Sequence, residues 1–258
     1  NRYRYYMGRN PMALISTSRG CPNRCSFCAI WRLMQGRYLA RSPQSVVSEL
    51  ASLDQKVVRF ADGNTFGDIK RVHAIADELL ASGVRKLIMM DVSTDIVIRQ
   101  PGLIEKLKKA GLFSVVVGIE SVKDEKLHKI RKKSTVADHV EAIGILHNNG
   151  IRVAGSFIAD HDFTDEDFDR MESFIFDNRI DYPLLNVQTP LPGTLLFEEH
   201  QDEILSFNYD HFDLRHPVLP TRMARDHWWK RFRRLDKKCI FKMLDNMPPV
   251  TSFLAKRA

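Results

Sequence analysis

Apolar runs that predict strands alternate with helical segments along most of this chain, and this alternation limits the possible folds more than any other feature. The helical segments carry their apolar residues on one face, and several end at a glycine, as at Gly83, Gly111 and Gly150. The strands are nearly continuous in apolar residues, which favours a parallel sheet covered by helices. The six expected strands occupy residues 12–17, 57–61, 86–91, 113–118, 151–158 and 182–187.

The number of these units indicates how the sheet is arranged. Eight strand–helix units close a barrel, so six predict an open, TIM-like partial (β/α)6 barrel of the α/β class. By analogy with closed barrels, reactive residues are expected at the C-terminal ends of the strands. After about residue 200 the alternation gives way to an irregular stretch and a helix from about 224 to 245. The sequence thus predicts a barrel over residues 1–200 and a helical and irregular C-terminal extension, 201–258, that caps it.

Composition narrows the class of protein without deciding its function. The 258 residues are 44% apolar and 28% charged, and no apolar run approaches the roughly 18 residues of a membrane span, so we expect a soluble globular protein without a transmembrane segment. The net charge of +7 is compatible with nucleic acid, an anionic membrane face or a phosphorylated substrate. The N-terminal NRYRYYMGRN has neither an initiator Met nor a signal segment, and we expect it to be the edge of a longer protein.

Three of the four cysteines lie close together, directly after the first expected strand. Cys21, Cys25 and Cys28 fall within eight positions, in the segment CPNRCSFC, and their odd number argues against disulfide pairing. Three thiolates suit a four-iron cluster with one open iron position; zinc, which would want a fourth ligand, and redox chemistry are the alternatives. Cys239 lies far along the chain in a helical stretch, where we expect it to pack in the interior.

The spacing C-x3-C-x2-C, with the aromatic Phe27 before the third cysteine, resembles the signature of the radical S-adenosylmethionine (SAM) superfamily. The resemblance implies that Cys21, Cys25 and Cys28 hold a [4Fe-4S] cluster whose unique iron is chelated by the amino and carboxylate groups of SAM. It further implies reductive cleavage of SAM to a 5′-deoxyadenosyl radical that abstracts hydrogen from a substrate carbon. The cofactors carry the difficult chemistry, while the protein orients them and keeps the site dry.

Residues at two strand ends are candidates for binding SAM. Asp62, Gly63 and Asn64 follow the second strand, where the superfamily often has a Gly-Gly-Glu-like segment that receives the SAM amino group; an ordinary turn is the alternative. Glu120 and Ser121 end the fourth strand, where a carboxylate and a hydroxyl can bind a ribose or an amino-acid head group. Helix capping by Ser121, with Glu120 facing solvent, is the alternative at this position.

Two further positions are suggested by the resemblance. Gly155 and Ser156 lie on the fifth strand, where the superfamily places backbone contacts to adenine and methionine; close packing is the alternative for Gly155. Relatives often place a basic residue on the methionine carboxylate after the fourth strand. The run 131–133, Arg-Lys-Lys, lies there, and the sequence does not show which of the three would serve.

The turn after the sixth strand narrows the resemblance to one branch. Thr189 and Pro190, candidate cofactor-binding residues, begin the segment TPLPGT, which is typical of radical enzymes with a cobalamin-binding domain upstream, as is GRYLARSPQSVVSEL after the cysteines. The segments SFIADHDFTDEDF, NYDHFDLRHPVLPTR and VSTDIVIRQP resemble the branch that contains the hopanoid C-3 methylase. The upstream domain is not within these residues, so cobalamin is an expectation from the branch alone.

The resemblance therefore implies a radical SAM enzyme, and specifically cobalamin-dependent C-methylation of a small or lipid-like substrate. A cluster of this kind implies a reducing, cytoplasmic compartment and an electron donor protein such as flavodoxin or ferredoxin. The alternatives are a radical SAM cyclase, a rearranging or dehydrogenating enzyme without cobalamin, an RNA-modifying methylthiotransferase, and a non-enzymatic, metal-stabilised interaction protein. A methylthiotransferase would need further cluster cysteines and an RNA-binding module, neither of which the sequence contains, so nucleic acid is not the expected partner.

Overall fold

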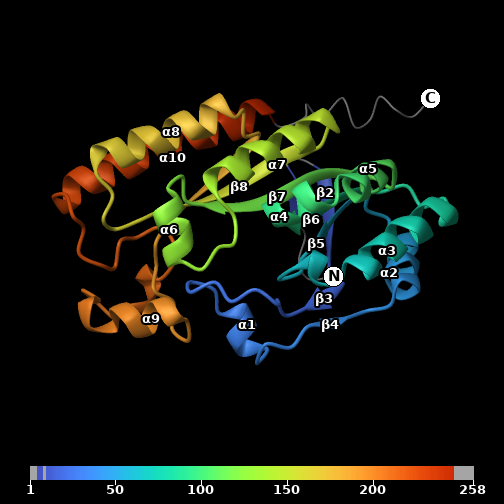
Figure 1. Ribbon diagram of the computed structural model, residues 1–258, viewed down its shortest axis with the longest axis horizontal. Coiled ribbons are helices and arrows are strands. Elements are labelled where there is room, and N and C mark those ends of the chain that lie inside the picture. The colour runs from blue at the N-terminus through green and yellow to red at the C-terminus, as the bar shows by residue number, and fades with distance from the viewer. Residues whose placement is uncertain (1–4, 8–9, 247–258) are drawn as a thin grey trace.

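The computed structural model describes residues 5–7 and 10–246, which form an α/β partial barrel (Figure 1). Seven strands make one curved sheet in the order β1, β2, β5, β6, β7, β8, β9. The strands from β2 to β9 are parallel and follow chain order, whereas β1 pairs antiparallel with β2. Their bounds are β1 (Tyr5–Met7), β2 (Asn10–Ile15), β5 (Val57–Phe60), β6 (Leu87–Val92), β7 (Leu112–Glu120), β8 (Arg152–Ala159) and β9 (Tyr182–Val187).

The parallel strands are the six that the sequence predicts, each within two residues at either end. The near-continuous burial of strands such as β7 and β8 shows why their sequences do not alternate between apolar and polar residues. Three short strands were not predicted. One is β1, and the others are β3 (Ser18–Arg19) and β4 (Leu39–Ala40), which form a small antiparallel pair on either side of the cysteine segment.

Helices between the strands begin and end at local signals in the sequence. The Ser42 hydroxyl accepts a hydrogen bond from the backbone N–H of Ser45 at the start of α2, and Gly83 ends α3 with a φ of +71°. The helices are α1 (Ile30–Leu33), α2 (Pro43–Ser52), α3 (Ile69–Ser82), α4 (Thr94–Arg99), α5 (Pro101–Lys109), α6 (Asp124–Lys129), α7 (Val136–Asn148), α8 (Asp165–Asp177), α9 (Leu195–His200) and α10 (Arg225–Asn246), with 3-10 turns η1 (Thr65–Gly67), η2 (Gln201–Glu203) and η3 (Tyr209–His211).

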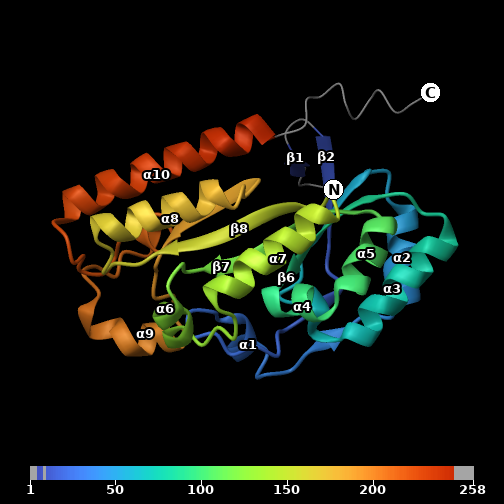
Figure 2. The same cartoon turned by 45° about the horizontal axis from the view of Figure 1, so that its top comes forward.

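Figure 2 shows two groups of helices at opposite ends of the sheet, with α4 and α7 between them. Helices α2, α3 and α5 lie together over one end of the sheet, and α8 and α10 lie side by side over the other. The longer helices turn their apolar faces inward; α2, for example, buries Val46, Val47 and Leu50. The core therefore lies between the sheet and this outer layer, and the C-terminal strand ends are left to the loops.

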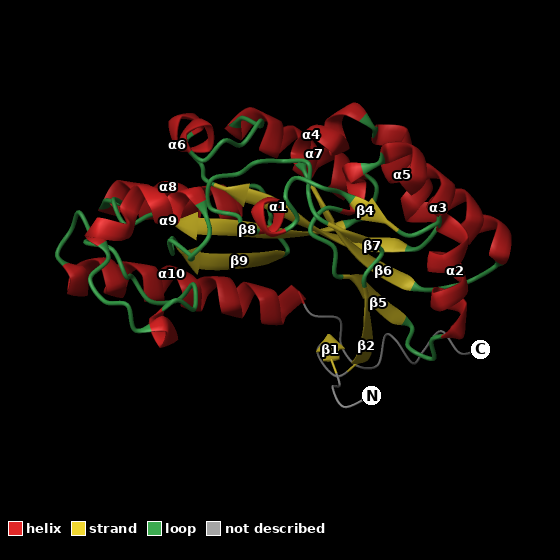
Figure 3. Ribbon diagram, turned by 90° about the horizontal axis from the view of Figure 1, so that it is seen from below, coloured by secondary structure: helices red, strands yellow, loops and turns green. Residues whose placement is uncertain are grey.

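The extension after residue 200 contains the long helix α10, which lies within one residue of the predicted range and packs along β9 (Figure 3). Trp228 is fully buried and stacks on Phe232 with a centroid distance of 5.6 Å. Its indole N–H donates to the backbone carbonyl of Asp160 at 3.2 Å. The extension is thus joined to the end of β8, and the domain division at residue 200 stays a prediction. Among the residues that the structure describes, no helix has the length and apolar character needed to cross a bilayer.

Candidate functional site

The cysteine segment forms a loop between β3 and α1, at the C-terminal end of the parallel sheet. The three thiols of Cys21, Cys25 and Cys28 are free and half-buried. The loop is fixed from both sides: the Ser26 backbone N–H donates to the carbonyl of Ile130 at 3.2 Å, and the Ser26 carbonyl accepts from the N–H of Leu196 at 3.0 Å. Residues after β7 and after β9 therefore hold the loop in place.

The environment of the thiols suits a soft metal cluster. Burial raises the pKa of both Cys25 and Cys28, and the nearby Lys132 ammonium opposes this shift at each. The Asn64 amide contacts the Cys21 sulfur at 3.6 Å, as hydrogen bonds to cluster sulfurs do. A purely thiolate donor set that is partly withdrawn from water fits an iron–sulfur cluster, and Cys239, buried in α10, is not part of it.

The segment from Asp62 to Asn64 lies beside this loop and makes hydrogen bonds that hold the loop and the chain before it in place. One carboxylate oxygen of Asp62 accepts from the backbone N–H groups of Thr17 and Ser18 at 2.7 and 2.9 Å, and the other accepts the Thr17 hydroxyl. A Cβ added to Gly63 would stand 2.8 Å from a methyl group of Ile30. The Asp62 carboxylate is thus occupied by the chain leading into the loop, and Asn64 is the residue of this segment that reaches a cysteine.

Glu120 and Lys132 form a buried ion pair at the end of β7. The Lys132 ammonium lies 3.4 Å from a Glu120 carboxylate oxygen and donates to the carbonyl of Gly118 at 2.9 Å. Burial raises the pKa of Glu120, while Lys132 and the Ser156 hydroxyl lower it. A side chain on Gly118 would collide with both partners. Of the basic run 131–133, Lys132 is therefore the residue directed toward the site, since Arg131 and Lys133 are exposed.

The backbone at Glu120 is unusual and supports a binding role. Its φ is +62°, and the pairing of β7 with β8 is irregular between Gly118 and Glu120. A left-handed conformation at a non-glycine residue costs of order 1–3 kcal/mol, and such outliers gather at functional sites. Ser121, next to it, is buried and accepts the backbone N–H of Lys123 at 3.2 Å. The strain therefore turns the Glu120 side chain toward the cavity at the mouth of the barrel.

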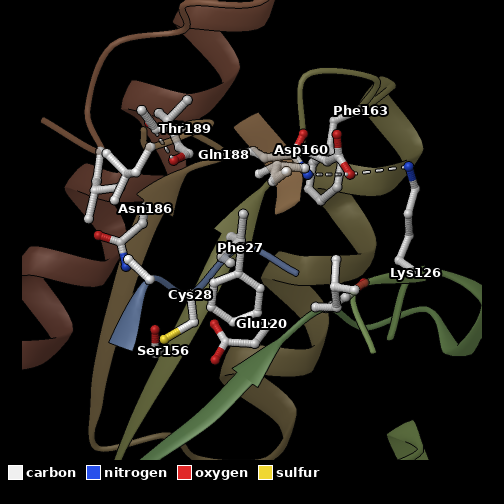
Figure 4. A pocket seen from close by; sticks show the side chains of 18 of the residues that line it. Phe27, Cys28, Glu120, Lys126, Ser156, Asp160, Phe163, Asn186, Gln188 and Thr189 are labelled. Atoms are coloured by element: carbon white, nitrogen blue, oxygen red, sulfur yellow. Dashed lines mark hydrogen bonds and ion pairs between the residues drawn. The ribbon is translucent and has the colours of Figure 1, made fainter. Parts of the chain in front are cut away.

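A cavity of about 390 Å³ lies between the cysteine loop and the C-terminal ends of β7, β8 and β9 (Figure 4). Its wall is mostly apolar, with Phe27, Ile158 and Phe163 among its members. Of the predicted site residues, the structure brings five to this cavity; they are Cys28, Glu120, Ser121, Ser156 and Thr189. The other predicted residues do not line it: Cys21, Cys25, Asp62, Gly63, Asn64, Gly155 and Pro190.

Gly155 lies in an apolar environment. A Cβ there would stand 2.8 Å from the ring of Phe157 and 3.1 Å from Ile119 and Ile180. Close packing therefore accounts for the absence of a side chain at this strand position. The neighbouring Ser156, by contrast, faces the cavity, as the alternation of side chains along a strand requires.

A second charged group on the same cavity was not predicted. The Lys126 ammonium lies 3.1 Å from an Asp160 carboxylate oxygen, and the His161 imidazole lies 2.9 Å from the other. Burial would raise the pKa of Asp160, but the hydrogen bond from His161 and the charge of Lys126 outweigh it and hold the pKa at about 2. Asn186 and Gln188, at the end of β9, complete the polar part of the wall. The cavity wall thus carries the Glu120 carboxylate, which pairs with Lys132, and the ion pair of Lys126 and Asp160.

The sequence contained a signal for some of these residues. Asp160 directly follows the fifth strand and Gln188 the sixth, so the strand-end argument applies to both as it does to Glu120. Lys126 gave no such signal, because it lies on the short helix α6, which has too few turns to show periodicity.

Residues 15–175 match the family model described as the radical SAM superfamily. This chain belongs to the radical SAM superfamily. Membership brings the cofactors of the superfamily, a [4Fe-4S] cluster and SAM, to this site, and the half-buried thiols of the cysteine loop fit the cluster. The partial-barrel fold predicted from the alternation is confirmed.

Curated relatives match most of the chain. It is 29% identical over 223 residues to the hopanoid C-3 methylase of Methylococcus capsulatus, covering 86% of this chain and 43% of the methylase. It is 30% identical over 243 residues to an anaerobic magnesium-protoporphyrin IX monomethyl ester cyclase of Cereibacter sphaeroides, covering 89% of this chain and 40% of the cyclase. The chain thus spans about two fifths of the length of these two relatives.

Solved structures agree on the fold. The radical SAM methyltransferase TsrM of Kitasatospora setae, with cobalamin and a [4Fe-4S] cluster bound, superimposes with a TM-score of 0.68 at 17% identity, over 94% of this chain and 54% of that protein. The cobalamin-dependent SAM radical enzyme OxsB gives a TM-score of 0.67 at 15% identity, over 86% of this chain and 40% of that protein. At these identities the likeness is one of fold.

Proposed function

We propose that this chain is the catalytic barrel of a cobalamin-dependent radical SAM C-methyltransferase that acts on a small, largely apolar or lipid-like substrate. The observation that carries the proposal is that Cys28, Glu120 and Ser156 share one predominantly apolar cavity. The similarity to a hopanoid methylase supports methylation and an apolar substrate, and the fold shared with two cobalamin-dependent enzymes supports cobalamin.

In this proposal Cys21, Cys25 and Cys28 hold the [4Fe-4S] cluster, and SAM lies between the cysteine loop and the strand ends. Bound there, the two cofactors supply one-electron cleavage of SAM and a radical that abstracts hydrogen. The Lys132 ammonium is placed to pair with the SAM carboxylate, and the Glu120 carboxylate to accept from its amino group or ribose. Ser121, Ser156 and Thr189 offer further hydrogen bonds from the cavity wall.

The apolar wall contributes by excluding water. Phe27, Ile158 and Phe163 leave few hydrogen-bonding groups on most of the cavity surface, which protects a reactive intermediate from side reactions. It also favours a substrate carbon with no polar group nearby. Lys126 and Asp160, farther from the cysteines, are placed to bind a polar group elsewhere on the substrate.

The electron donor is proposed to approach the open side of the cysteine loop. Arg24, Arg131 and Lys133 are exposed beside Cys25 and give this rim a positive charge. An acidic protein such as flavodoxin or ferredoxin suits such a rim. Reversing the charge of Arg24 and Lys133 should slow reduction by the protein donor and leave reduction by dithionite unchanged. A protein with such a cluster operates in a reducing compartment, and we propose that this compartment is the cytoplasm.

The test is an anaerobic assay of the iron-reconstituted protein with reductant and SAM, with and without methylcobalamin, in which nucleosides are quantified by mass spectrometry. We expect 5′-deoxyadenosine in both, and S-adenosylhomocysteine only when cobalamin is present. Cys25→Ala should abolish both products and the iron, whereas the matched Cys239→Ala should retain all three. Failure of the iron-loaded protein to cleave SAM would refute the proposal.

A cyclase is the second candidate, favoured by the 30% identity to the magnesium-protoporphyrin ester cyclase. The same assay separates the two functions. A cyclase would form 5′-deoxyadenosine with its substrate and no S-adenosylhomocysteine at any cobalamin concentration.

A further inference from the structure

His161, His200 and Glu203 lie close together and do not line the cavity, although His161 contacts Asp160 and Gln188 of its wall. His161 follows β8, whereas His200 ends α9 and Glu203 ends η2. The imidazole of His200 lies 3.1 Å from a Glu203 carboxylate oxygen, and the two imidazole rings meet edge to face with centroids 5.4 Å apart. One ligand atom from each of the three residues lies within 4.8 Å of the other two. None of the three has a part in the function proposed above.

Hydrogen bonds fix the imidazole of His161 with one nitrogen free. Its Nδ1 lies 2.6 Å from the side-chain oxygen of Gln188 and 2.9 Å from a carboxylate oxygen of Asp160. Both partners accept, so the proton lies on Nδ1 and the lone pair on Nε2. Metal-bound histidines are held in the same way, by a carboxylate or carbonyl on the nitrogen that does not bind the metal. This is the arrangement expected of a metal ligand.

The separation of the three groups is close to that of a coordination sphere. Zinc–nitrogen and zinc–oxygen bonds of about 2.1 Å place tetrahedral ligands about 3.4 Å apart. The pair formed by His200 and Glu203 is already that close, at 3.1 Å, so His161 and the pair need to approach by at most about 1.4 Å. Glu203 is exposed and free to adjust its side chain, while His200 is almost fully buried. Most of the adjustment therefore falls to the Glu203 side chain.

We propose that His161, His200 and Glu203 bind a divalent transition-metal ion of the zinc type, separate from the iron–sulfur cluster. Two imidazoles and one carboxylate make a three-ligand set that leaves a fourth position for water. The ion would join the end of β8 to the segment of α9 and η2. That segment also carries Leu196, whose side chain lines the cavity, so the ion fixes part of the substrate-cavity wall.

The experiment measures zinc and iron together in the iron-reconstituted protein by plasma mass spectrometry, after incubation with Zn²⁺ and desalting. We expect about one zinc per chain in addition to the cluster iron. His161→Ala and Glu203→Gln should lose the zinc and keep the iron. Because the side chain of Glu203 is half-exposed, Glu203→Gln tests the site without disturbing the core. Asp160→Asn should weaken zinc binding by about 10- to 100-fold, as loss of a supporting carboxylate does elsewhere.

The chain offers a matched control on its surface. His216 lies 2.9 Å from Asp213 at the same i, i+3 spacing, and its ring is 5.2 Å from that of His211, without three ligand atoms converging there in the described part of the chain. His216→Ala should keep the zinc. A variant with all three cluster cysteines replaced by Ala should also keep it. Absence of retained zinc in the wild type, equal loss in His216→Ala, or loss in the cysteine variant would each overturn the proposal.

Discussion

The buried imidazole of His139 leads to a quantitative prediction of how the stability of the protein depends on pH. This residue of α7 is fully buried, and neither ring nitrogen has a hydrogen-bond partner among the described residues. Burial, together with the nearby Lys132 ammonium, lowers its pKa from 6.5 to about 4. His139 is therefore neutral in the native protein at physiological pH, and protonating it in place is unfavourable.

The shift converts into a pH-dependent stability with a defined sign. Well above pH 6.5 the imidazole is neutral in both states, so it contributes no pH dependence there. As the pH falls below 6.5, the unfolded chain takes up a proton that the native protein does not, and stability falls until about pH 4. Each pKa unit corresponds to about 1.4 kcal/mol, so the whole shift amounts to roughly 3 kcal/mol, of which about 2 kcal/mol develops between pH 7.5 and pH 5.

The perturbation is His139→Leu, which removes the titrating group and leaves an apolar side chain of similar size. The free energy of unfolding would be measured by urea titration with far-UV circular dichroism at several values between pH 5 and 7.5. Iron-free protein would be used, so that acid loss of the cluster does not contribute. We expect the wild type to lose about 2 kcal/mol more than the variant across this range, because all other groups titrate alike in both proteins.

His128→Leu is the control, since His128 is exposed on α6. It should retain the pH dependence of the wild type. Parallel stability curves for the wild type and His139→Leu would refute the argument, because they would show that His139 is protonated in the native state as readily as in the unfolded chain.

Three further predictions concern the site and the loop that holds it. Lys132→Met should weaken SAM binding by about tenfold or more in equilibrium dialysis while iron content is unchanged, and the exposed Lys133→Met should bind normally, since Lys132 pairs with Glu120 of the cavity wall. Thr17→Val removes a donor from a buried carboxylate and should lower the free energy of unfolding by about 1–2 kcal/mol in thermal or urea unfolding. Gly20→Ala places a Cβ 2.0 Å from a backbone oxygen and should reduce iron per chain, whereas Gly36→Ala, also at positive φ but with open space, should not; equal iron in all three proteins would contradict this.

The parallel sheet was predictable because its signals are local and repeated. A strand such as β8 is largely apolar, and the helices between the strands are amphipathic with clear ends, such as Gly83 after α3. The short elements were missed for a physical reason. Helices α4, α6 and α9 have six residues each, too few to show a period of 3.6, and β3 and β4 form because the chain around the cysteine loop returns on itself.

The candidate site was predictable where a strand end coincides with a polar residue. Glu120 and Ser156 meet this condition and line the cavity. The sequence did not show that Lys132 rather than Lys133 turns inward, because this depends on the positive φ of Arg131 and on the space left by Gly118. Nor did it show that the Asp62 carboxylate is occupied by donors that precede it by more than forty residues. Such contacts depend on the tertiary fold.

An open barrel differs from a closed one in having two free sheet edges, and unpaired edges invite pairing with other chains. On one side the final strand is β1, only three residues long. On the other, the backbone of β9 is engaged by the C-terminal extension: the N–H of Val187 donates to the carbonyl of Leu214 at 2.7 Å, and the carbonyl of Leu185 accepts from Arg215 at 2.8 Å. The extension therefore covers the edge of β9 and hinders its pairing with other chains. A chain ending before residue 214 would expose β9 to strands of neighbouring molecules, and we expect it to aggregate.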